Sequence, residues 1–342
     1  MYTTDLSHEQ SFNNEIVAQN LVKNYTLKES RGPFKKKAKK SITAVDGISL
    51  HIPQGNIIGV LGINGAGKTT TIRMLSSMVE PTSGQLTLNG KDAVKNHLWV
   101  KERVNIISGG ERNLYWRLTA RENLAYFGSL YGLGKNVLKQ RTEELLKIVG
   151  LEDVSDIPVE RYSKGMKQRL QIARGLINDP EYIFLDEPTL GLDIVIAQEI
   201  RKLIFHLAKE KKKGILLTTH YIREAEELCD YIYVLDKGKI IAQGTKEELK
   251  EIFQNEPLLM IKIKENQTES LQNIMSKLNT GIEMIYENGE ITIPGNPDQW
   301  SSVLGVLIEN RIEILNMDIQ EPNLEEILMK IIHQSRGKSI ET

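Results

Sequence analysis

Residues 62–69, with the sequence GINGAGKT, constrain the fold more than any other segment of the chain. They fit the spacing G-x-x-x-x-G-K-[ST] and follow the apolar run 57–61, which reads as a buried strand. Apolar residues then recur at helical spacing over 69–78, until Pro81 ends the pattern. This order of strand, glycine-rich turn and helix directs backbone N–H groups and a helix N-terminus at one point. The segment therefore predicts a phosphate-binding turn, or P-loop.

Two further apolar runs predict more strands of the same sheet. Residues 182–185 and 214–218 read as buried strands, and the segment 194–211 between them reads as a helix. Alternating strands and helices predict a parallel sheet with crossover helices, so the fold class is α/β. A more helical stretch covers 121–178, and we place a helical subdomain at about residues 111–178.

The first ninety residues predict an antiparallel arm beside that sheet. Residues 14–24 are strand-like, and strand patterns resume at Ile42. Residues 86–88 precede the pair Asn89-Gly90, which is typical of a hairpin turn. The stretch 29–40 is mostly basic and carries a glycine and a proline, so we expect a loop there.

A second, smaller domain is expected after the first domain, which we place at residues 14–255. Thr245 opens a capping box and a short helix, and residues 255–257, Asn-Glu-Pro, read as a boundary. The elements that follow are expected at 258–264, 268–278, 282–286, 290–293, 297–309, 312–319 and 324–332. Their order, βαββαβ plus a helix, predicts a ferredoxin-like α+β domain over 256–342. Because this half carries no paired carboxylates, histidine cluster or glycine-rich loop, we expect a packing or docking module.

Two adjacent carboxylates end the apolar strand 182–185. In a P-loop sheet such a strand end lies near the nucleotide, and successive side chains on a strand diverge. We therefore give the two carboxylates different tasks. Asp186 joins Thr69 in the shell of a Mg²⁺ ion, and Glu187 polarises the attacking water. Lys68 is expected to contact the β- and γ-phosphate oxygens.

Three further motifs resemble those of ABC transporter ATPases. Residues 162–168, with the sequence YSKGMKQ, resemble the signature motif of that family. Residues 191–193, GLD, resemble its D-loop, and His220, which closes the strand 215–219, resembles its switch histidine. The five motifs occur in the family's order within residues 14–253. The resemblance implies a P-loop ABC cassette with a RecA-like parallel sheet, an antiparallel β arm and a helical signature subdomain.

The resemblance also implies an ATP–Mg²⁺ site shared by two cassettes. Ser163 is a good N-cap residue, and in the family this helix tip, with Gly165, binds the γ-phosphate held by the second cassette. Asp193 would couple the two sites, and Tyr25 matches the aromatic residue that stacks on adenine. The implied nucleotide-contacting set is Tyr25, Asn64, Gly65, Ala66, Gly67, Lys68, Thr69, Thr70, Ser163, Gly165 and Asp193, and the catalytic set is Lys68, Glu187 and His220.

The chain departs from the family pattern in two places. The family carries a Gln between the P-loop and the signature, and the matching slot here is Gly110, followed by Glu111. Because the P-loop, both carboxylates and His220 remain, we still expect hydrolysis. The basic insertion at 26–40 is longer than the family pattern. It reads as a solvated loop or as a contact with anionic lipid headgroups.

Composition narrows the choice of partners. The 342 residues carry 44 Lys+Arg against 45 Asp+Glu, so net charge gives no reason to bind nucleic acid. No apolar run approaches the roughly 18–20 residues that span a bilayer. The N-terminus lacks a signal-peptide pattern, and the one cysteine, Cys229, cannot form an internal disulfide. We expect a cytoplasmic subunit held at the inner face of the membrane by a separate permease. A second cassette would complete a homodimer or a heterodimer.

The overall pattern is similar to bacterial cassettes that serve export-type permeases for drugs, antibiotics or peptides. This likeness rests on Asn64 in the P-loop, on the Ser-Lys-Gly-Met signature, and on residues 321–326, EPNLEE. Two alternatives stay open. A soluble ABC-type ATPase acting on ribosomes or DNA is disfavoured by the single P-loop and by the short separation of Lys68 and Ser163. A nucleotide-dependent regulator that does not turn over draws support from Gly110.

Overall fold

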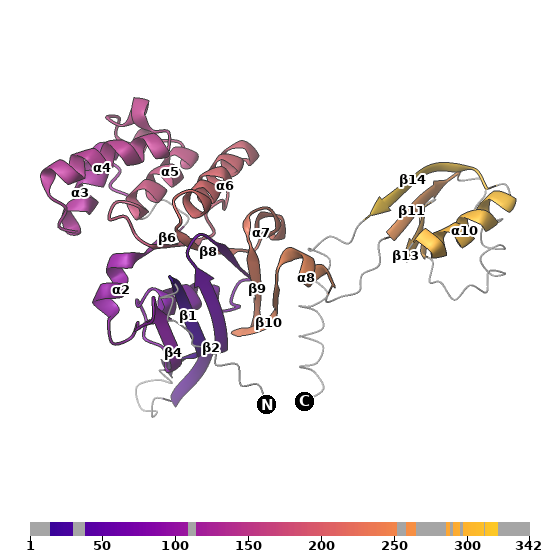
Figure 1. Ribbon diagram of the computed structural model, residues 1–342, viewed down its shortest axis with the longest axis horizontal. Coiled ribbons are helices and arrows are strands. Elements are labelled where there is room, and N and C mark those ends of the chain that lie inside the picture. Colours follow the sequence, from indigo (N-terminus) through magenta and orange to yellow (C-terminus); the bar gives the residue numbers. More distant parts are fainter. Residues whose placement is uncertain are drawn as a thin grey trace, which may run out of the picture. The chain divides into compact units, whose positions relative to one another are not determined.

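The computed structural model describes residues 14–29, 38–108, 114–251, 258–264, 285–287, 290–294, 297–310 and 312–320 (Figure 1). The chain divides into two compact units between Thr245 and Lys246, ahead of the boundary expected at 255. The short helix α8 (Lys246–Glu251) therefore belongs with the second unit. Each unit has its own apolar core and is described separately below.

A six-stranded sheet forms the centre of the first unit, and its strand order decides where the motifs meet. The order is β10-β9-β3-β8-β7-β6, and all neighbours are parallel except the hairpin of β9 and β10. The carboxyl ends of β3, β8 and β7 therefore lie side by side, which brings together three motifs that are far apart in the sequence. The strands are β3 (Ile57–Leu61), β6 (Val104–Ser108), β7 (Tyr182–Asp186), β8 (Gly214–Thr219), β9 (Tyr231–Asp236) and β10 (Lys239–Gly244).

The central strands β3, β7, β8 and β9 are buried on both faces, as their continuous apolar sequences predict. Along β7, Ile183 and Leu185 face the apolar cluster of the helical region, whereas Tyr182 and Phe184 face the cluster beneath the antiparallel arm. This confirms the predicted parallel α/β core. The crossover helices are α1 (Lys68–Leu75), α2 (His97–Arg103), α6 (Ile194–Lys209) and α7 (Ile222–Leu228).

The antiparallel arm has the strand order β2-β1-β4-β5. Its turn at Asn89 and Gly90 has φ values of 47° and 76°, as a two-residue hairpin of type I′ requires. The strands are β1 (Glu15–Glu29), β2 (Ala38–Pro53), β4 (Ser83–Leu88) and β5 (Lys91–Asp92).

The basic insertion at 26–40 is strand at both ends, so the expectation of a loop over 29–40 is wrong for Glu29 and for residues 38–40. Thr26 pairs with Ser41, and Lys28 pairs with Lys39. Backbone pairing between β1 and β2 extends strand structure into a lysine-rich segment that has low strand propensity. Residues 30–37 lie outside the described part of the chain.

Three helices form the predicted helical region. They are α3 (Ala120–Leu130), α4 (Lys135–Ile148) and α5 (Lys164–Gly175), followed by the turn that leads into β7. Thr119 and Glu122 form a capping box at the start of α3, because each side chain bonds the other residue's backbone N–H. Leu124, Leu145 and Leu170 join the three helices to one face of the sheet in a single apolar cluster.

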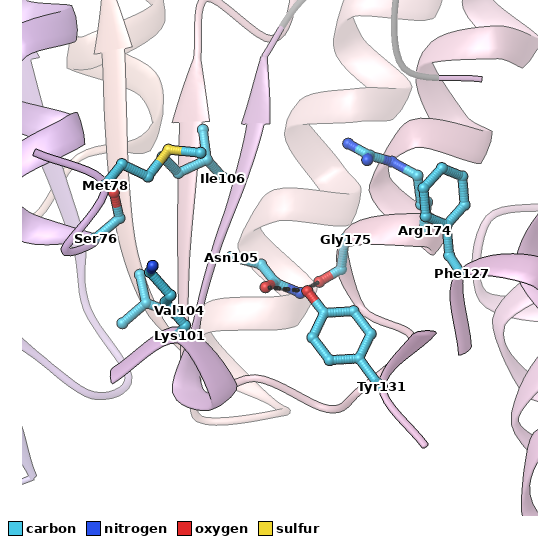
Figure 2. A pocket seen from close by; sticks show the side chains of 10 residues that line it. All are labelled: Ser76, Met78, Lys101, Val104, Asn105, Ile106, Phe127, Tyr131, Arg174 and Gly175. Atoms are coloured by element: carbon cyan, nitrogen blue, oxygen red, sulfur yellow. Dashed lines mark hydrogen bonds between the residues drawn. The ribbon is translucent and has the colours of Figure 1, made fainter. Parts of the chain in front are cut away.

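A cavity of about 520 Å³ lies where the helical region meets β6 (Figure 2). Arg174 lies against the ring of Phe127, with its guanidinium carbon 5.0 Å from the ring centroid. The Tyr131 hydroxyl donates to Asn105 Oδ1 at 3.0 Å. The lining residues are Ser76, Met78, Lys101, Val104, Asn105, Ile106, Phe127, Tyr131, Arg174 and Gly175.

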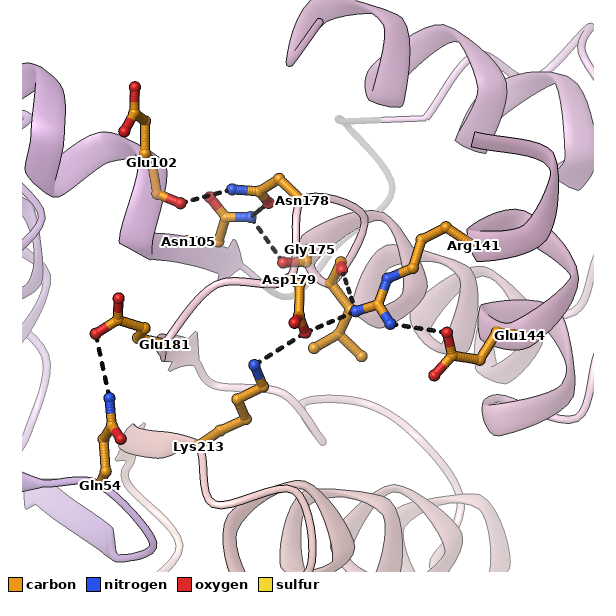
Figure 3. A network of polar contacts seen from close by, with 11 residues as sticks. Gln54, Glu102, Asn105, Arg141, Glu144, Gly175, Asn178, Asp179, Glu181 and Lys213 are labelled. Atoms are coloured by element: carbon orange, nitrogen blue, oxygen red, sulfur yellow. Dashed lines mark hydrogen bonds and ion pairs between the residues drawn. The ribbon is translucent and has the colours of Figure 1, made fainter. Parts of the chain in front are cut away.

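Polar contacts fasten the helical region to the core next to this cavity (Figure 3). Asn105 Nδ2 donates to the Gly175 carbonyl at 2.7 Å. Arg141 on α4 and Lys213 before β8 both donate to Asp179 Oδ1, at 2.8 and 2.9 Å. Burial raises the pKa of Asp179, but the hydrogen bonds and charges of Lys213 and Arg141 outweigh burial and hold that pKa below its ordinary value. The Asp179 carboxylate therefore stays charged and links two separate segments.

The second unit contains a four-stranded antiparallel sheet with the order β12-β13-β11-β14. Trp300 and Leu307 of helix α10 (Pro297–Glu309) pack in its apolar core. The expected helices at 268–278 and 324–332 lie outside the described residues, so the ferredoxin-like assignment stays a prediction. The strands are β11 (Leu258–Ile263), β12 (Ile285–Glu287), β13 (Glu290–Pro294) and β14 (Ile314–Gln320).

Gly175 offers a test of the close contact between α5 and β6. A Cβ at Gly175 would lie 2.4 Å from both Cγ1 and Cδ1 of Ile107. We expect Gly175→Ala to lower the free energy of unfolding by about 1–3 kcal/mol through overpacking. Adding Ile107→Val removes Cδ1, one of the two atoms in the clash. The double variant should therefore lose less unfolding free energy than the sum of the losses in the two single variants. Chemical denaturation of the four proteins checks this, and strictly additive losses would contradict it.

Candidate functional site

The glycine-rich turn between β3 and α1 is held on two sides. Gly67, with φ 106°, precedes α1. A Cβ at Gly67 would lie 2.7 Å from the Ala44 carbonyl oxygen and 3.3 Å from Gly238 Cα. Gly238, in the turn between β9 and β10, donates its N–H to the Ala66 carbonyl at 2.9 Å. Only glycine fits at position 67 because both the backbone angle and the neighbouring backbone exclude a side chain.

A cavity of about 420 Å³ opens over this turn. It is bounded by the turn, by the start of α1, by a stretch of β2, and by one residue each from the ends of β7 and β9. The predicted residues 64–70 and Glu187 all line it. Its lining residues are Ile42, Thr43, Ala44, Ile63, Asn64, Gly65, Ala66, Gly67, Lys68, Thr69, Thr70, Glu187 and Lys237.

Lys68 places an ammonium group at the floor of this cavity. Its side chain is 7% exposed, and Nζ donates to the Gly62 carbonyl at 2.6 Å. Nζ also lies 4.0 Å from Glu187 Oε1. Burial lowers the pKa of Lys68, and the carboxylates of Glu187 and Asp186 act in the opposite direction. The site thus combines a desolvated cation with converging backbone N–H groups, which suits a phosphate chain.

Asp186 and Thr69 supply oxygen atoms at the edge of the cavity. Thr69 Oγ1 donates to Asp186 Oδ2 at 3.4 Å, and Thr218 Oγ1 donates to Asp186 Oδ1 at 2.5 Å. The Thr218 contact orients the carboxylate toward Thr69. One carboxylate and one hydroxyl fit Mg²⁺, which takes its other ligands from water and substrate phosphates. Among the described residues, no group of three or more His, Cys, Asp and Glu side chains could hold a metal ion.

Glu187 and His220 form a pair at the ends of neighbouring strands. The two side chains are 3.2 Å apart, measured from His220 Nδ1 to Glu187 Oε1. Glu187 has φ 52°, in the left-handed region, and its N–H donates to the Thr218 carbonyl at 3.0 Å. Such strain in a non-glycine residue persists only where its surroundings hold it. The left-handed turn sends the Glu187 side chain toward the cavity.

The signature and D-loop residues form a second group, away from the cavity lining. The Oγ atom of Ser163 caps α5 by accepting from Met166 N–H at 3.2 Å. Asp193 Oδ1 caps α6 by accepting from Ile196 N–H at 2.9 Å. Gly165 is buried, and a Cβ there would lie 2.6 Å from Ile196 Cγ2. Gly165 therefore allows α5 to pack closely against the start of α6.

Two further predicted positions are Tyr25 and Gly110. Tyr25 lies in β1 and pairs with Ile42, which lines the cavity, but Tyr25 is not among the lining residues. Gly110, the slot of the family's Gln, lies outside the described residues. The sequence prediction omitted Lys237 and Thr218. The Lys-Gly pair at 237–238 after an apolar strand is a turn signal that could have placed Lys237 opposite the P-loop.

Comparison with known proteins gives the family. A family model described as ABC transporter matches residues 45–190. The ABC transporter ATP-binding protein NatA of Bacillus subtilis is 44% identical over 233 residues, which are 68% of this chain and 94% of NatA. The chain belongs to the ABC transporter family.

Other relatives and solved structures agree with this assignment. The bacitracin transport ATP-binding protein BcrA of Bacillus licheniformis is 35% identical over 84% of this chain and 92% of BcrA. The structure of cbiO1 from Clostridium perfringens has a TM-score of 0.61 and 26% identity, and covers 78% of this chain and 96% of its own. A dimeric post-hydrolysis cassette bound to ADP and Pi has a TM-score of 0.57 and 25% identity, over 67% of this chain and 98% of its own. This chain is an ABC-type ATPase, which binds and hydrolyses ATP as a transporter subunit.

The two inner glycines of the P-loop give a matched test of the site. Gly65 has φ 86°, and a Cβ at this position would have no atom within 4 Å. Gly67 has φ 106°, and a Cβ there would contact the Ala44 carbonyl oxygen. We expect Gly65→Ala to cost about 1 kcal/mol of unfolding free energy through backbone strain alone. Gly67→Ala should cost about 2–4 kcal/mol, because overpacking adds to strain, and it should also lose ATP binding. Denaturant unfolding and nucleotide titration compare the two, and equal costs would count against the packing described above.

Proposed function

We propose that this ABC ATPase powers the export of a drug, antibiotic or peptide through a separate membrane permease. The observation that carries the proposal is the convergence of Lys68, Asp186, Glu187 and His220 at one edge of the sheet. Its relatives include ATP-binding proteins named for bacitracin transport and for linearmycin and daunorubicin resistance. These names support an export substrate of that chemical class for this chain.

Each side chain of the site has a separate role in the proposed hydrolysis of ATP. Lys68 and the P-loop N–H groups neutralise charge on the phosphate oxygens. Glu187 accepts a hydrogen bond from the attacking water. His220, which contacts the Glu187 carboxylate, holds that carboxylate in position. Thr69 and Asp186 would hold Mg²⁺. When bound there, Mg²⁺ supplies Lewis-acid stabilisation of the phosphoryl oxygens.

A second cassette would complete the site. Ser163 is exposed at the tip of α5, and the first turn of a helix presents backbone N–H groups that suit a phosphate. Beside Asp193, the apolar side chains of Leu190, Ile194 and Val195 are 44%, 77% and 65% exposed. Burial of that patch against another copy or a similar cassette would favour association. Ser163, Gly165 and Asp193 would then act on the nucleotide held by the partner cassette.

The permease is proposed to bind at the 520 Å³ cavity beside β6. Lys101 and Arg174 both line it, and within the described part of the chain Arg174 Nε has no hydrogen-bond partner. A largely desolvated guanidinium whose Nε lacks an acceptor favours an incoming carboxylate. A permease segment with an acidic residue fits this surface, and it would hold the subunit at the inner face of the membrane. None of the described helices has the length and apolar character needed to cross a bilayer.

Glu187→Gln separates a hydrolysing subunit from a nucleotide-dependent regulator. The amide keeps the shape of the side chain but cannot act as a base, so we expect ATP turnover to fall by about 100-fold or more. ATP affinity should stay within about twofold, because Lys68 and the P-loop are intact. Steady-state phosphate release and equilibrium nucleotide binding measure both quantities. A wild-type rate no higher than the variant's rate would favour the regulator.

Lys101→Glu tests the permease surface. The charge reversal should repel an acidic segment, and we expect about tenfold less membrane protein to copurify with the chain from detergent-solubilised cells. Lys139→Glu makes the same charge change on an exposed position of α4 outside the cavity, and it serves as the control. Quantitative mass spectrometry identifies and measures the copurifying protein. Equal losses for the two variants, or no copurifying membrane protein at all, would contradict this part of the proposal.

A further inference from the structure

Glu224 on α7 is a buried carboxyl group that the hydrolytic mechanism above does not use. It is 3% exposed, and Oε1 accepts a hydrogen bond of 2.7 Å from Thr189 Oγ1. Among the described residues, its Oε2 atom has no hydrogen-bond partner. Burial raises the pKa of Glu224, although the nearby Thr219 and Thr189 hydroxyls oppose this change. Burial of a carboxyl group with so few partners is unfavourable, so this group needs an explanation.

The Thr189–Glu224 hydrogen bond joins the turn that begins at Glu187 to the first turn of α7, which begins immediately after His220. In the first turn, Leu190 N–H donates to the Glu187 carbonyl at 3.2 Å, and Thr189 lies inside this turn. In the second, Glu224 N–H donates to the Tyr221 carbonyl at 3.2 Å. Each turn is closed by its own backbone bonds, and the side-chain bond is a link between them away from the reacting groups.

We propose that Thr189 and Glu224 are positioning residues, which hold the Glu187 carboxylate in register with His220. The inference rests on the roles proposed above for Glu187 and His220. The 3.2 Å contact between those two side chains depends on where their turns lie, because both follow the ends of strands rather than lying within them. The left-handed backbone of Glu187 makes its side chain sensitive to any movement of the turn. A shift of about 1 Å in such a group can lower a rate by about 100-fold.

Thr189→Val and Thr189→Ser form the matched pair that tests this link. Valine keeps the shape of threonine but removes the donor, whereas serine keeps the hydroxyl and removes only a methyl group. We expect Thr189→Val to lower kcat by about tenfold or more, with ATP affinity within about twofold of wild type. Thr189→Ser should keep at least about half of the wild-type kcat, because the hydrogen bond to Glu224 remains.

The partner residue supplies the second half of the experiment. Glu224→Gln retains an acceptor oxygen and should keep most of the activity, whereas Glu224→Leu should resemble Thr189→Val. The double variant Thr189→Val with Glu224→Leu should be no slower than the slower single variant, because both substitutions remove one shared link. Thermal unfolding of the wild type and the five variants accompanies the kinetics, and the loss of kcat should not follow the loss of melting temperature.

Three outcomes of the turnover measurements would overturn the inference. They are wild-type turnover in Thr189→Val, equal losses in Thr189→Val and Thr189→Ser, and multiplicative losses in the double variant. A fall in ATP affinity as large as the fall in kcat would also overturn it, because that result marks general disruption of the site. The Glu187→Gln variant separates the two proposals. If it turns over at the wild-type rate, the proposed role of Glu187 fails, whereas an inactive Glu187→Gln beside a fully active Thr189→Val defeats only the positioning role.

Discussion

The parallel pairing of β3, β8 and β7 is the constraint on which the site depends. It places the ends of three strands next to one another, although residues 62, 187 and 220 are far apart along the chain. The register is decisive because Leu61 pairs with Thr219 and Asp186 pairs with Thr218. A slip of one residue would turn the side chains at these ends to the opposite faces. The apolar residues on both faces of these strands therefore hold the proposed catalytic groups in place as well as the fold.

Short polar contacts orient the side chains that the sheet brings together. Thr218 bonds the Asp186 carboxylate with its hydroxyl and the Glu187 N–H with its carbonyl, so one residue of β8 orients two residues at the end of β7. On the far side of the first unit, Asp179 joins α4 to the segment before β8 through Arg141 and Lys213. The two sets of contacts differ in character. The Thr218 contacts lie at the proposed catalytic site, and the Asp179 contacts lie where the helical region meets the core.

The sequence predicted the core and the phosphate-binding turn because both leave strong local patterns. Apolar runs such as 57–61 and 182–185 have few alternatives to a buried strand, and the glycine spacing at 62–69 is specific. Less could be predicted where tertiary contacts decide the structure. The strand at Ala38 owes its conformation to pairing with Glu29, and Lys237 reaches the cavity only because the hairpin of β9 and β10 folds over it. The Thr189–Glu224 link has no sequence pattern, since it joins residues 35 positions apart through a side-chain hydrogen bond.

Gly67 is enclosed by backbone from two distant segments, Ala44 of β2 and Gly238 of the last hairpin of the core. The walls of the phosphate-binding turn are thus supplied by the beginning and the end of the first unit, while the motif itself occupies eight residues in between. A fragment that stopped before residue 237 would contain every residue of the motif. It would still lack Gly238, whose backbone packs against Gly67. The capacity to hold a nucleotide therefore appears only when the first unit has closed upon itself, and a partly synthesised chain would not yet possess it.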